Sequence, residues 1–265
     1  MPLMLNQKLC NESVIANLQS NFAAGQPYRH VLIDDFLDPF FARKLSENFP
    51  SLEQMKTKYN GINEKKAEHS DFTKLSHEFS TLKQILFDKE VLKLVEKITG
   101  IQGLQTIDDR FGFGLHQGGS GSFLDIHIDY NLHPLQKKQR RVNLLIFLNE
   151  EWRENWGGLL QLWNADVTKC VTSILPVFNR CVLFECSSIA YHGYNTIHCP
   201  PSLTRKSFYT YFFSDPEGEV NFHDTVFKPL PHESRLKKII VTGKEGLKNG
   251  IKRALYKTGL MKFLK

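Results

Sequence analysis

The stretch FLDIHIDYN, residues 123–131, reads as a β-strand that carries an imidazole and a carboxylate on one face. Side chains alternate between the two faces of a strand, so residues two apart share a face. His127 and Asp129 therefore point the same way, whereas Ile126 and Ile128 point into a core. Because imidazole and carboxylate groups are common ligands of transition metals, the stretch predicts part of a metal site.

A third candidate ligand stands much later in the chain. His192 lies in the stretch IAYHGYN, residues 189–195, and several strand-like runs separate it from Asp129. In a β-barrel, that separation lets two non-adjacent strands face each other across the interior. His127, Asp129 and His192 would then form the two-histidine, one-carboxylate arrangement that leaves positions open on iron. A single histidine is more often a surface or core residue than a ligand. The prediction therefore rests on the order in which the three residues occur along the chain.

A cation follows the third candidate ligand. In the stretch RKSFYTYFF, residues 205–213, Arg205 and Ser207 share a strand face while Lys206 points the other way. A guanidinium with a neighbouring hydroxyl suits a buried carboxylate, which arginine grips through two parallel hydrogen bonds. The alternative is that Arg205 is a surface charge at the end of a strand.

Strand-like runs dominate the chain from residue 104 onward. Turn residues separate them, and no helical pattern intervenes, which predicts a barrel or a sandwich. The runs lie at residues 104–117, 122–129, 141–148, 158–163, 170–175, 181–186 and 206–213.

The first hundred residues read differently. A strand is predicted at residues 28–35, and Asp38 followed by Pro39 is typical of a helix start. Helical patterns follow at residues 75–87 and 90–98. The polar residues 51–72 between these elements predict a solvated loop, with a lid over a site as the alternative.

Composition bounds the location and the partners. The five cysteines form no CxxC pair, which favours reduced thiols and a cytoplasmic protein. The chain shows no secretory signal pattern and no apolar run of about 18 residues. Residues 234–265 hold ten Lys or Arg and one acid in a chain of net charge +6, which leaves 6 − 9 = −3 for the rest.

This basic tail has a helical texture, although three glycines weaken it. Leu247, Ile251, Leu255 and Met261 could form an apolar stripe beside basic residues. The pattern is typical of a segment that contacts a membrane surface, a nucleic acid or an acidic partner, and its apolar residues favour the membrane over nucleic acid. The alternative is a solvated helix docked on the body.

The ordered set His127-x-Asp129, His192 and Arg205-x-Ser207 resembles the iron(II)/2-oxoglutarate-dependent dioxygenases. Within them the chain is most similar to the prolyl-4-hydroxylase-like branch. Three further stretches support the resemblance: RVNLLIFLN (141–149), WGGLLQLW (156–163) and PVFNRCVLF (176–184). The resemblance extends from about residue 28 to residue 213.

The resemblance implies a mainly β, α+β fold: a double-stranded β-helix (jelly roll, cupin-like) with N-terminal helices packed outside it. We expect an oxygenase domain over residues 1–233, with its core at 104–214, and a basic helical tail over 234–265. The implied reaction is hydroxylation of an unactivated C–H bond with release of succinate and CO2. A catalytically silent binding or scaffold protein and a cupin-like metal hydrolase or isomerase are the alternatives.

The resemblance also assigns roles to residues. Fe(II) would be held by His127, Asp129 and His192, with O2 as oxidant and ascorbate as a reductant. The 2-oxoglutarate would be bound by Arg205, Ser207 and Asn143, although Asn143 could equally satisfy a neighbouring backbone group.

The substrate is left open between a peptidyl proline, a free amino acid and a sugar. Collagen-type prolyl hydroxylases use a lysine where this chain has Arg205, and a tyrosine common in relatives about ten residues before the His-x-Asp pair has no match. Candidates for substrate contact are His116, Tyr130, Asn131 and Tyr194, whose alternative role is that of polar residues near a cavity mouth. The oligomeric state is also left open.

Overall fold

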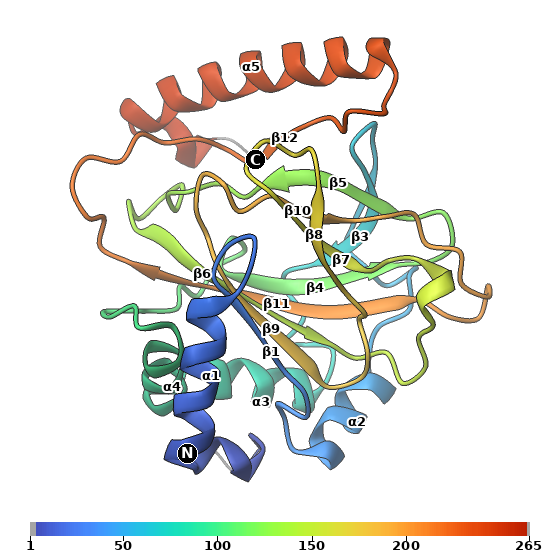
Figure 1. The fold of residues 1–265 in the computed structure, drawn as a ribbon, viewed down its shortest axis with the longest axis vertical. Coiled ribbons are helices and arrows are strands. Elements are labelled where there is room, and N and C mark those ends of the chain that lie inside the picture. Colours follow the sequence, from blue (N-terminus) through green and yellow to red (C-terminus); the bar gives the residue numbers. More distant parts are fainter. Residues whose placement is uncertain (1–3, 264–265) are drawn as a thin grey trace.

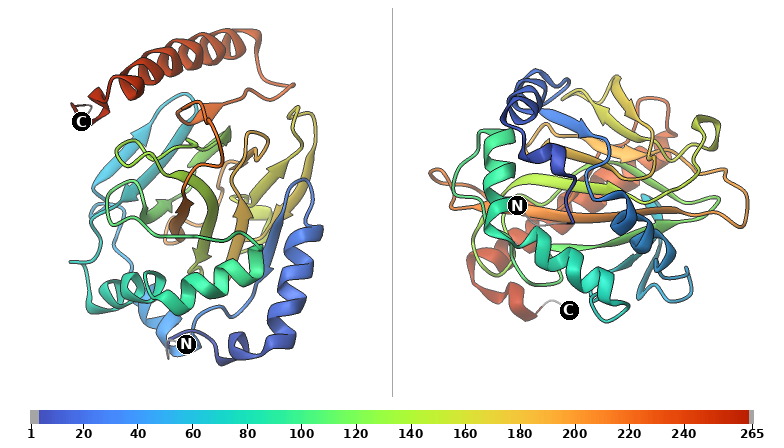
Figure 2. Two further views of the ribbon diagram at one scale, coloured as in Figure 1. Left: turned by 90° about the vertical axis from the view of Figure 1, so that its left-hand side faces the viewer. Right: turned by 90° about the horizontal axis from the view of Figure 1, so that it is seen from below.

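The computed structural model describes residues 4–263. A curled β-sheet lies between two groups of helices (Figures 1 and 2). On one side pack the N-terminal helices α1 (Glu12–Ala24), α2 (Pro39–Glu47), α3 (His77–Leu86) and α4 (Lys89–Thr99). The opposite side carries α5 (Arg235–Lys257), which runs across the top of the molecule in Figure 1. Short 3-10 helices lie at Gln7–Cys10, Glu154–Trp156 and Leu260–Phe263.

The sheet consists of antiparallel neighbours throughout the described pairings. Its strands are β1 (His30–Ile33), β2 (Thr57–Asn60), β3 (Glu64–His69), β4 (Phe113–Gly118), β5 (Phe123–Ile128), β6 (Gln139–Phe147), β7 (Leu160–Trp163), β8 (Cys170–Ile174), β9 (Arg180–Glu185), β10 (His192–Tyr194), β11 (Arg205–Ser214) and β12 (Val226–Phe227). The order is β1-β9-β6-β11-β4-β3-β5-β10-β7-β8, with β2 paired to β3 and β12 paired to β5. This topology confirms the predicted double-stranded β-helix.

Strand alternation separates an outer core from an inner one. On β6, Leu144 and Ile146 join the core shared with the N-terminal helices, whereas Leu145 and Phe147 point inward. The inner cluster takes residues from β6, β7, β8, β9 and β11, so the two halves of the sheet face each other. The same alternation turns Arg205 and Ser207 of β11 toward the interior, because Phe208 lies in the outer core.

The N-terminal elements follow the predicted boundaries closely. Asp38 caps α2 by accepting a hydrogen bond from the Phe41 backbone N–H at 3.0 Å, and Pro39 is the first helical residue. At the end of α4, Gly100 adopts the left-handed conformation with φ of 73°, which favours glycine. The sequence predicted this helix start and this helix end because helix capping depends on residues that are neighbours in the chain.

Two predictions about this half of the chain were wrong. Residues 51–72 are not a solvated loop, since β2 and β3 form a hairpin and β3 pairs with both β4 and β5. Ala67 and His69 on one face of β3 are buried, while Glu64 and Lys66 face inward, so charged inward residues masked the strand. The run at 104–117 forms a strand only from Phe113 onward.

The basic tail forms a 23-residue helix, α5, in which only part of the predicted stripe is exposed. Leu247 and Ile251 are exposed, whereas Leu255 and Met261 pack near Phe222 of the body. The reason is that Leu255 lies at the edge of the stripe, beside the face of α5 that contacts the body, while Met261 lies beyond α5 in the 3-10 helix Leu260–Phe263. Within the described residues, no helix is long and apolar enough to cross a membrane.

Candidate active site

The three predicted metal ligands come together at neighbouring strands. His127 of β5 pairs in register with His192 of β10, and Asp129 follows one residue after β5. The sequence predicted strands facing across the barrel, but β5 and β10 are adjacent. Each histidine Nε2 atom lies 3.7 Å from an Asp129 carboxylate oxygen, and the three ligand atoms lie within 4.8 Å of one another.

Backbone contacts orient both imidazoles. The His127 Nδ1 atom lies 2.9 Å from the Asp125 carbonyl, and the His192 Nδ1 atom lies 3.0 Å from the Ala190 carbonyl. Because a carbonyl only accepts, Nδ1 carries the proton and Nε2 presents its lone pair toward Asp129. Burial, together with the nearby His127, lowers the pKa of His192 to about 4, so this ring stays neutral and able to bind a metal.

Arg140 is a site residue that sequence reasoning missed. Its Nη1 lies 2.8 Å from the Asp129 Oδ2 atom, and its guanidinium is sandwiched between the rings of Tyr130 and Tyr211, at 3.5 and 3.6 Å from their centroids. The contact is an ion pair, and its geometry does not meet hydrogen-bond criteria. Burial opposes ionisation of Asp129, but the charge of the Arg140 guanidinium outweighs it and holds the pKa of that carboxyl well below its usual range.

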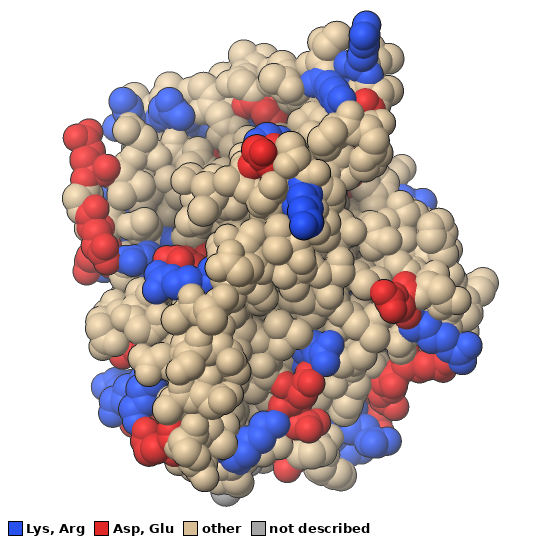
Figure 3. All heavy atoms as spheres, in the orientation of Figure 1, with Lys and Arg blue, Asp and Glu red and all other residues tan. Residues whose placement is uncertain are grey.

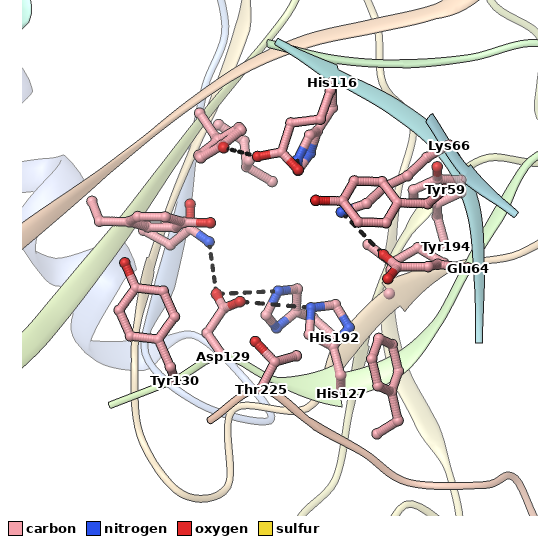
Figure 4. Close-up of a pocket in the computed structure, with 18 of the residues that line it drawn as sticks. Tyr59, Glu64, Lys66, His116, His127, Asp129, Tyr130, His192, Tyr194 and Thr225 are labelled. Atoms are coloured by element: carbon pink, nitrogen blue, oxygen red, sulfur yellow. Dashed lines mark hydrogen bonds and ion pairs between the residues drawn. The ribbon is translucent and has the colours of Figure 1, made fainter. Parts of the chain in front are cut away.

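The ligands open into a cavity of about 360 Å³, shown in Figure 4. The triad lies on one side of this cavity, and His116 and Lys66 lie on the other. Its walls come from β3, β4, β5, β10, β11 and α5, which supply Glu64, Lys66, Glu68, His116, His127, His192, Tyr194, Arg205, Ser207, Tyr209, Lys248 and Lys252.

Arg205 is buried in this cavity without an acidic partner among residues 4–263. Its Nε donates a 2.7 Å hydrogen bond to the Gly158 carbonyl, and its guanidinium lies 4.4 Å from the Tyr194 ring centroid. Burial lowers the pKa of Arg205 to about 10. A side chain at Gly158, where φ is 68°, would lie only 3.1 Å from the Arg205 Cδ, which explains the glycine. A buried, unpaired guanidinium facing a cavity fits the carboxylate of a small molecule.

The hairpin contributes a polar wall that the sequence did not reveal. Tyr209 donates a hydrogen bond to Glu68, and the His116 Nε2 lies 3.7 Å from that same carboxylate. Burial disfavours charge on Lys66, yet Glu68 and Glu64 raise the pKa of Lys66 to about 12. The signal was the alternation of Glu64, Lys66 and Glu68, which places three ionisable groups on one strand face.

The other candidates divide into those that reach the cavity and those that do not. Tyr194 lines it beside Arg205, and His116 lines it but faces Glu68. Tyr130 lines it while its hydroxyl donates to the Phe111 carbonyl at 2.6 Å. Asn131 is not among its lining residues. Its side chain hydrogen-bonds the backbone of Asn221 and His223, beside a separate cavity of about 470 Å³.

Asn143 has a partner that neither sequence interpretation named. Its Nδ2 donates to the Asp129 Oδ2 at 3.3 Å, so it contacts a predicted metal ligand and not a backbone group. Its Oδ1 is buried without a partner in the described residues and lies at the cavity wall.

Two imidazoles and a carboxylate that face a cavity, inside a double-stranded β-helix with a buried arginine, define the class of non-haem iron oxygenases. Comparison with known proteins agrees. Residues 113–213 match the family described as the 2OG-Fe(II) oxygenase superfamily. The matched segment, which holds the ligand triad and Arg205, belongs to this superfamily, and the chain has the fold of solved prolyl-4-hydroxylases.

The individual relatives share less than 30% sequence identity with this chain. Prolyl 3-hydroxylase OGFOD1 of Mus musculus is 27% identical over 173 residues, which is 63% of this chain and 29% of that protein. A prolyl-4-hydroxylase from Pseudomonas putida superposes with a TM-score of 0.57 at 18% identity, covering 76% of this chain and all of that one. A prolyl hydroxylase from Trichoplax adhaerens, in complex with a hypoxia inducible factor peptide fragment, gives 0.54 at 19% identity, with 76% and 91% coverage.

The chain therefore spans less than a third of its mouse relative's length. The cofactors of the family are Fe(II) and 2-oxoglutarate, with O2 as oxidant. The residues present fit them, because the His127 and His192 lone pairs converge with the Asp129 carboxylate and Arg205 lacks an acidic partner among the described residues.

Proposed function

We propose that the chain is an Fe(II)- and 2-oxoglutarate-dependent dioxygenase that hydroxylates an unactivated C–H bond. When bound, the cofactors supply an oxidation in which one atom of O2 enters succinate, with release of CO2, and the other becomes the new hydroxyl group. The observation that carries the proposal is that the ligand triad and the unpaired Arg205 line one cavity.

The chain's own residues bind, orient and shield. His127, Asp129 and His192 would hold the metal from one side only, which leaves its other positions facing the cavity. Arg205 would grip the distal carboxylate of 2-oxoglutarate, and the Ser207 hydroxyl on the same strand face would donate to it. Apolar Leu145 and Leu160 line the cavity nearby, which limits water around the reacting groups.

The alternatives lack a supporting observation. A silent scaffold has no need of a complete ligand set, and here all three ligands and Arg205 are present. A cupin-like hydrolase or isomerase has no need of a buried arginine that awaits a carboxylate. The dioxygenase accounts for both features.

For the substrate we propose a prolyl or peptidyl group, or a compact small molecule such as a sugar. The mouse relative's name and the Trichoplax peptide complex support the first. The second is favoured by the cavity itself, because Lys248 and Lys252 of α5 lie over it and its β3 wall is polar, which suits a hydroxyl-rich group.

Two measurements test the activity. With Fe(II) and O2, we expect the wild type to convert 2-oxoglutarate to succinate, and His127→Ala to abolish this conversion. Without O2, Fe(II) and 2-oxoglutarate should give the weak visible charge-transfer band of the chelate. Arg205→Met should not show the band at the 2-oxoglutarate concentration that gives it in the wild type, although it should still bind the metal. An iron-loaded wild type that shows neither band nor succinate would refute the proposal.

We also propose a cytoplasmic location and ascorbate as a supporting reductant. All five cysteines are free thiols in the structure, which suits a reducing compartment. Cell fractionation tests the location, and the dependence of sustained turnover on added ascorbate tests the reductant.

A further inference from the structure

Helix α5 has an inner face that its contacts define. Val241 and Glu245 are only 1% and 5% exposed. Lys252 lies 2.8 Å from the Asp224 carboxylate, and Tyr256 stacks on Phe222 at 4.5 Å between ring centroids. These contacts fix the rotation of the helix about its axis, and so fix which side chains point away from the body.

The outer face of α5 is an aliphatic stripe. Its exposed residues are spaced by three, one, seven and four positions, which keeps them within about a third of the helix circumference. They are Leu236, Ile239, Ile240, Leu247 and Ile251, exposed by 68%, 71%, 43%, 69% and 53%. Five of the twelve large apolar side chains that are exposed in the described residues thus lie on this one helix. Such concentration marks an interaction surface.

Free cations border the stripe. Arg235, Lys244 and Lys257 are exposed and have no ion-pair partner among residues 4–263. The single acid of α5, Glu245, faces the body. In Figure 3, Lys and Arg side chains lie at both ends of the upper edge that α5 forms in Figure 1. The outer face is therefore apolar along its middle and positive along its borders.

From this combination we infer that α5 docks its outer face flat on a membrane surface that contains anionic phospholipid. The aliphatic side chains enter the boundary between head groups and acyl chains, and the bordering cations meet the lipid phosphates. The helix lies on the membrane and does not cross it, in agreement with the finding that no helix in residues 4–263 is long and apolar enough to span one.

Charge decides against the other occupants. A second copy packed face to face would bring the unpaired cations of two α5 helices together, which costs free energy without any acid to offset it. A nucleic acid would be met by phosphate-binding cations, but the middle of the face offers only Leu and Ile. An anionic bilayer accommodates both parts of the face at once.

The docking also orients the proposed active site. Membrane binding can be tested without any catalytic activity, so the inference does not depend on the proposed reaction. Lys248 and Lys252 on the inner face of the same helix line the cavity. Docking would thus hold the cavity about one helix diameter, roughly 10 Å, from the lipid surface. A substrate carried at that surface would lie close to the site.

Co-sedimentation with vesicles tests the inference. The wild type should bind vesicles of phosphatidylcholine mixed with phosphatidylglycerol, bind pure phosphatidylcholine weakly, and lose binding as salt rises. The double substitution Leu247→Glu and Ile251→Glu should weaken partitioning by at least about tenfold, because each buried aliphatic side chain contributes roughly that factor. Lys244→Glu should weaken binding to the anionic vesicles and reduce its dependence on salt, which Arg235 and Lys257 would still partly maintain.

The matched control is Phe40→Glu, which replaces a side chain 71% exposed on α2, on the other side of the molecule. It should bind vesicles as the wild type does. The outer residues are exposed, so thermal unfolding should be unchanged in all variants, whereas deleting α5 would also remove the wall of the cavity. Equal vesicle binding by the double variant and the wild type would overturn the inference. The inference would also be overturned if the wild type failed to bind vesicles and instead self-associated or bound duplex DNA, and if the double variant abolished that association.

Discussion

At the scale of single residues, Arg140 shows how a ligand can depend on a side chain outside any motif. Asp129 is nearly enclosed, and an isolated carboxylate would resist ionisation there. The guanidinium of Arg140 keeps it charged, and the rings of Tyr130 and Tyr211 hold the guanidinium in place. Asn143 adds a hydrogen bond to the same oxygen. The carboxylate is thereby oriented before any metal arrives.

Replacing Arg140 by Met should lower the affinity for divalent metal by roughly 10- to 100-fold, since partners of a metal ligand contribute about this much. Titration calorimetry with Mn²⁺ measures it. The control is Arg141→Met, whose neighbouring guanidinium pairs with the exposed Glu217 and should leave metal affinity unchanged. If Arg140→Met does not fold, Arg140→Lys retains the charge without the stacking. Unaltered metal affinity in both Arg140 variants would show that Asp129 needs no such support.

His116 should make folding sensitive to acid. Burial and the charge of Lys66 lower its pKa in the folded state, although Glu68 opposes them. A depressed folded pKa means that the unfolded chain binds the proton more readily. The contribution of neutral His116 to folding stability is therefore fully present above the pKa of about 6.5 in the unfolded chain. It is lost as the pH falls below that value. In urea unfolding at pH 7 and pH 5, His116→Gln should lose less stability on acidification than the wild type. The exposed His232, changed to Gln, should follow the wild type.

At the scale of elements, strand β3 is the segment whose role changed most. Its outward residues Ala67 and His69 are buried against the layer of N-terminal helices, and its inward residues are charged because they line the cavity. A strand whose inward side chains are charged lacks the alternation of apolar and polar residues that predicts a half-buried strand. The sequence therefore predicted a loop. Pairing with both β4 and β5 makes it the bridge between the two halves of the sheet.

The strand assignment predicts unequal effects at two nearby positions. Ala67→Gln should destabilise folding by about 2–4 kcal/mol, because it places a polar amide in a packed core. Lys65→Gln, on the same strand face but exposed, should stay within about 0.5 kcal/mol of the wild type. Urea unfolding provides both values. Small and equal effects would instead support the solvated loop.

At the scale of the whole molecule, α5 and the N-terminal helices cover the barrel from opposite sides (Figure 2). The N-terminal helices share an extensive apolar core with the sheet, whereas α5 is attached by ion pairs to Asp224 and Asp125 and by a small apolar cluster around Phe222. We therefore expect α5 to open locally at a lower free energy than the rest of the fold. Such opening would uncover the cavity that Lys248 and Lys252 help to line.

Asp224→Asn should loosen this attachment. Removing a partly buried charge that pairs with Lys248 and Lys252 should increase amide hydrogen exchange in α5 by roughly tenfold, corresponding to about 1–2 kcal/mol. Exchange in β6 and β11 should not change. Asp215→Asn, whose carboxylate is 86% exposed and pairs with Lys138, is the matched control. Uniform exchange across wild type and variant would show that α5 is held by other contacts.

The sequence by itself determined the order His127, Asp129, His192, Arg205 and the strands that carry them, because ligand chemistry and two-residue alternation are local properties. Helix starts and stops, such as Asp38 and Gly100, were local too. Only the tertiary structure decided that β5 and β10 are neighbours, that Arg140 supports Asp129, and that β3 and α5 wall the cavity. These depend on which distant segments pair and on how much charge burial their partners compensate, which no local pattern encodes.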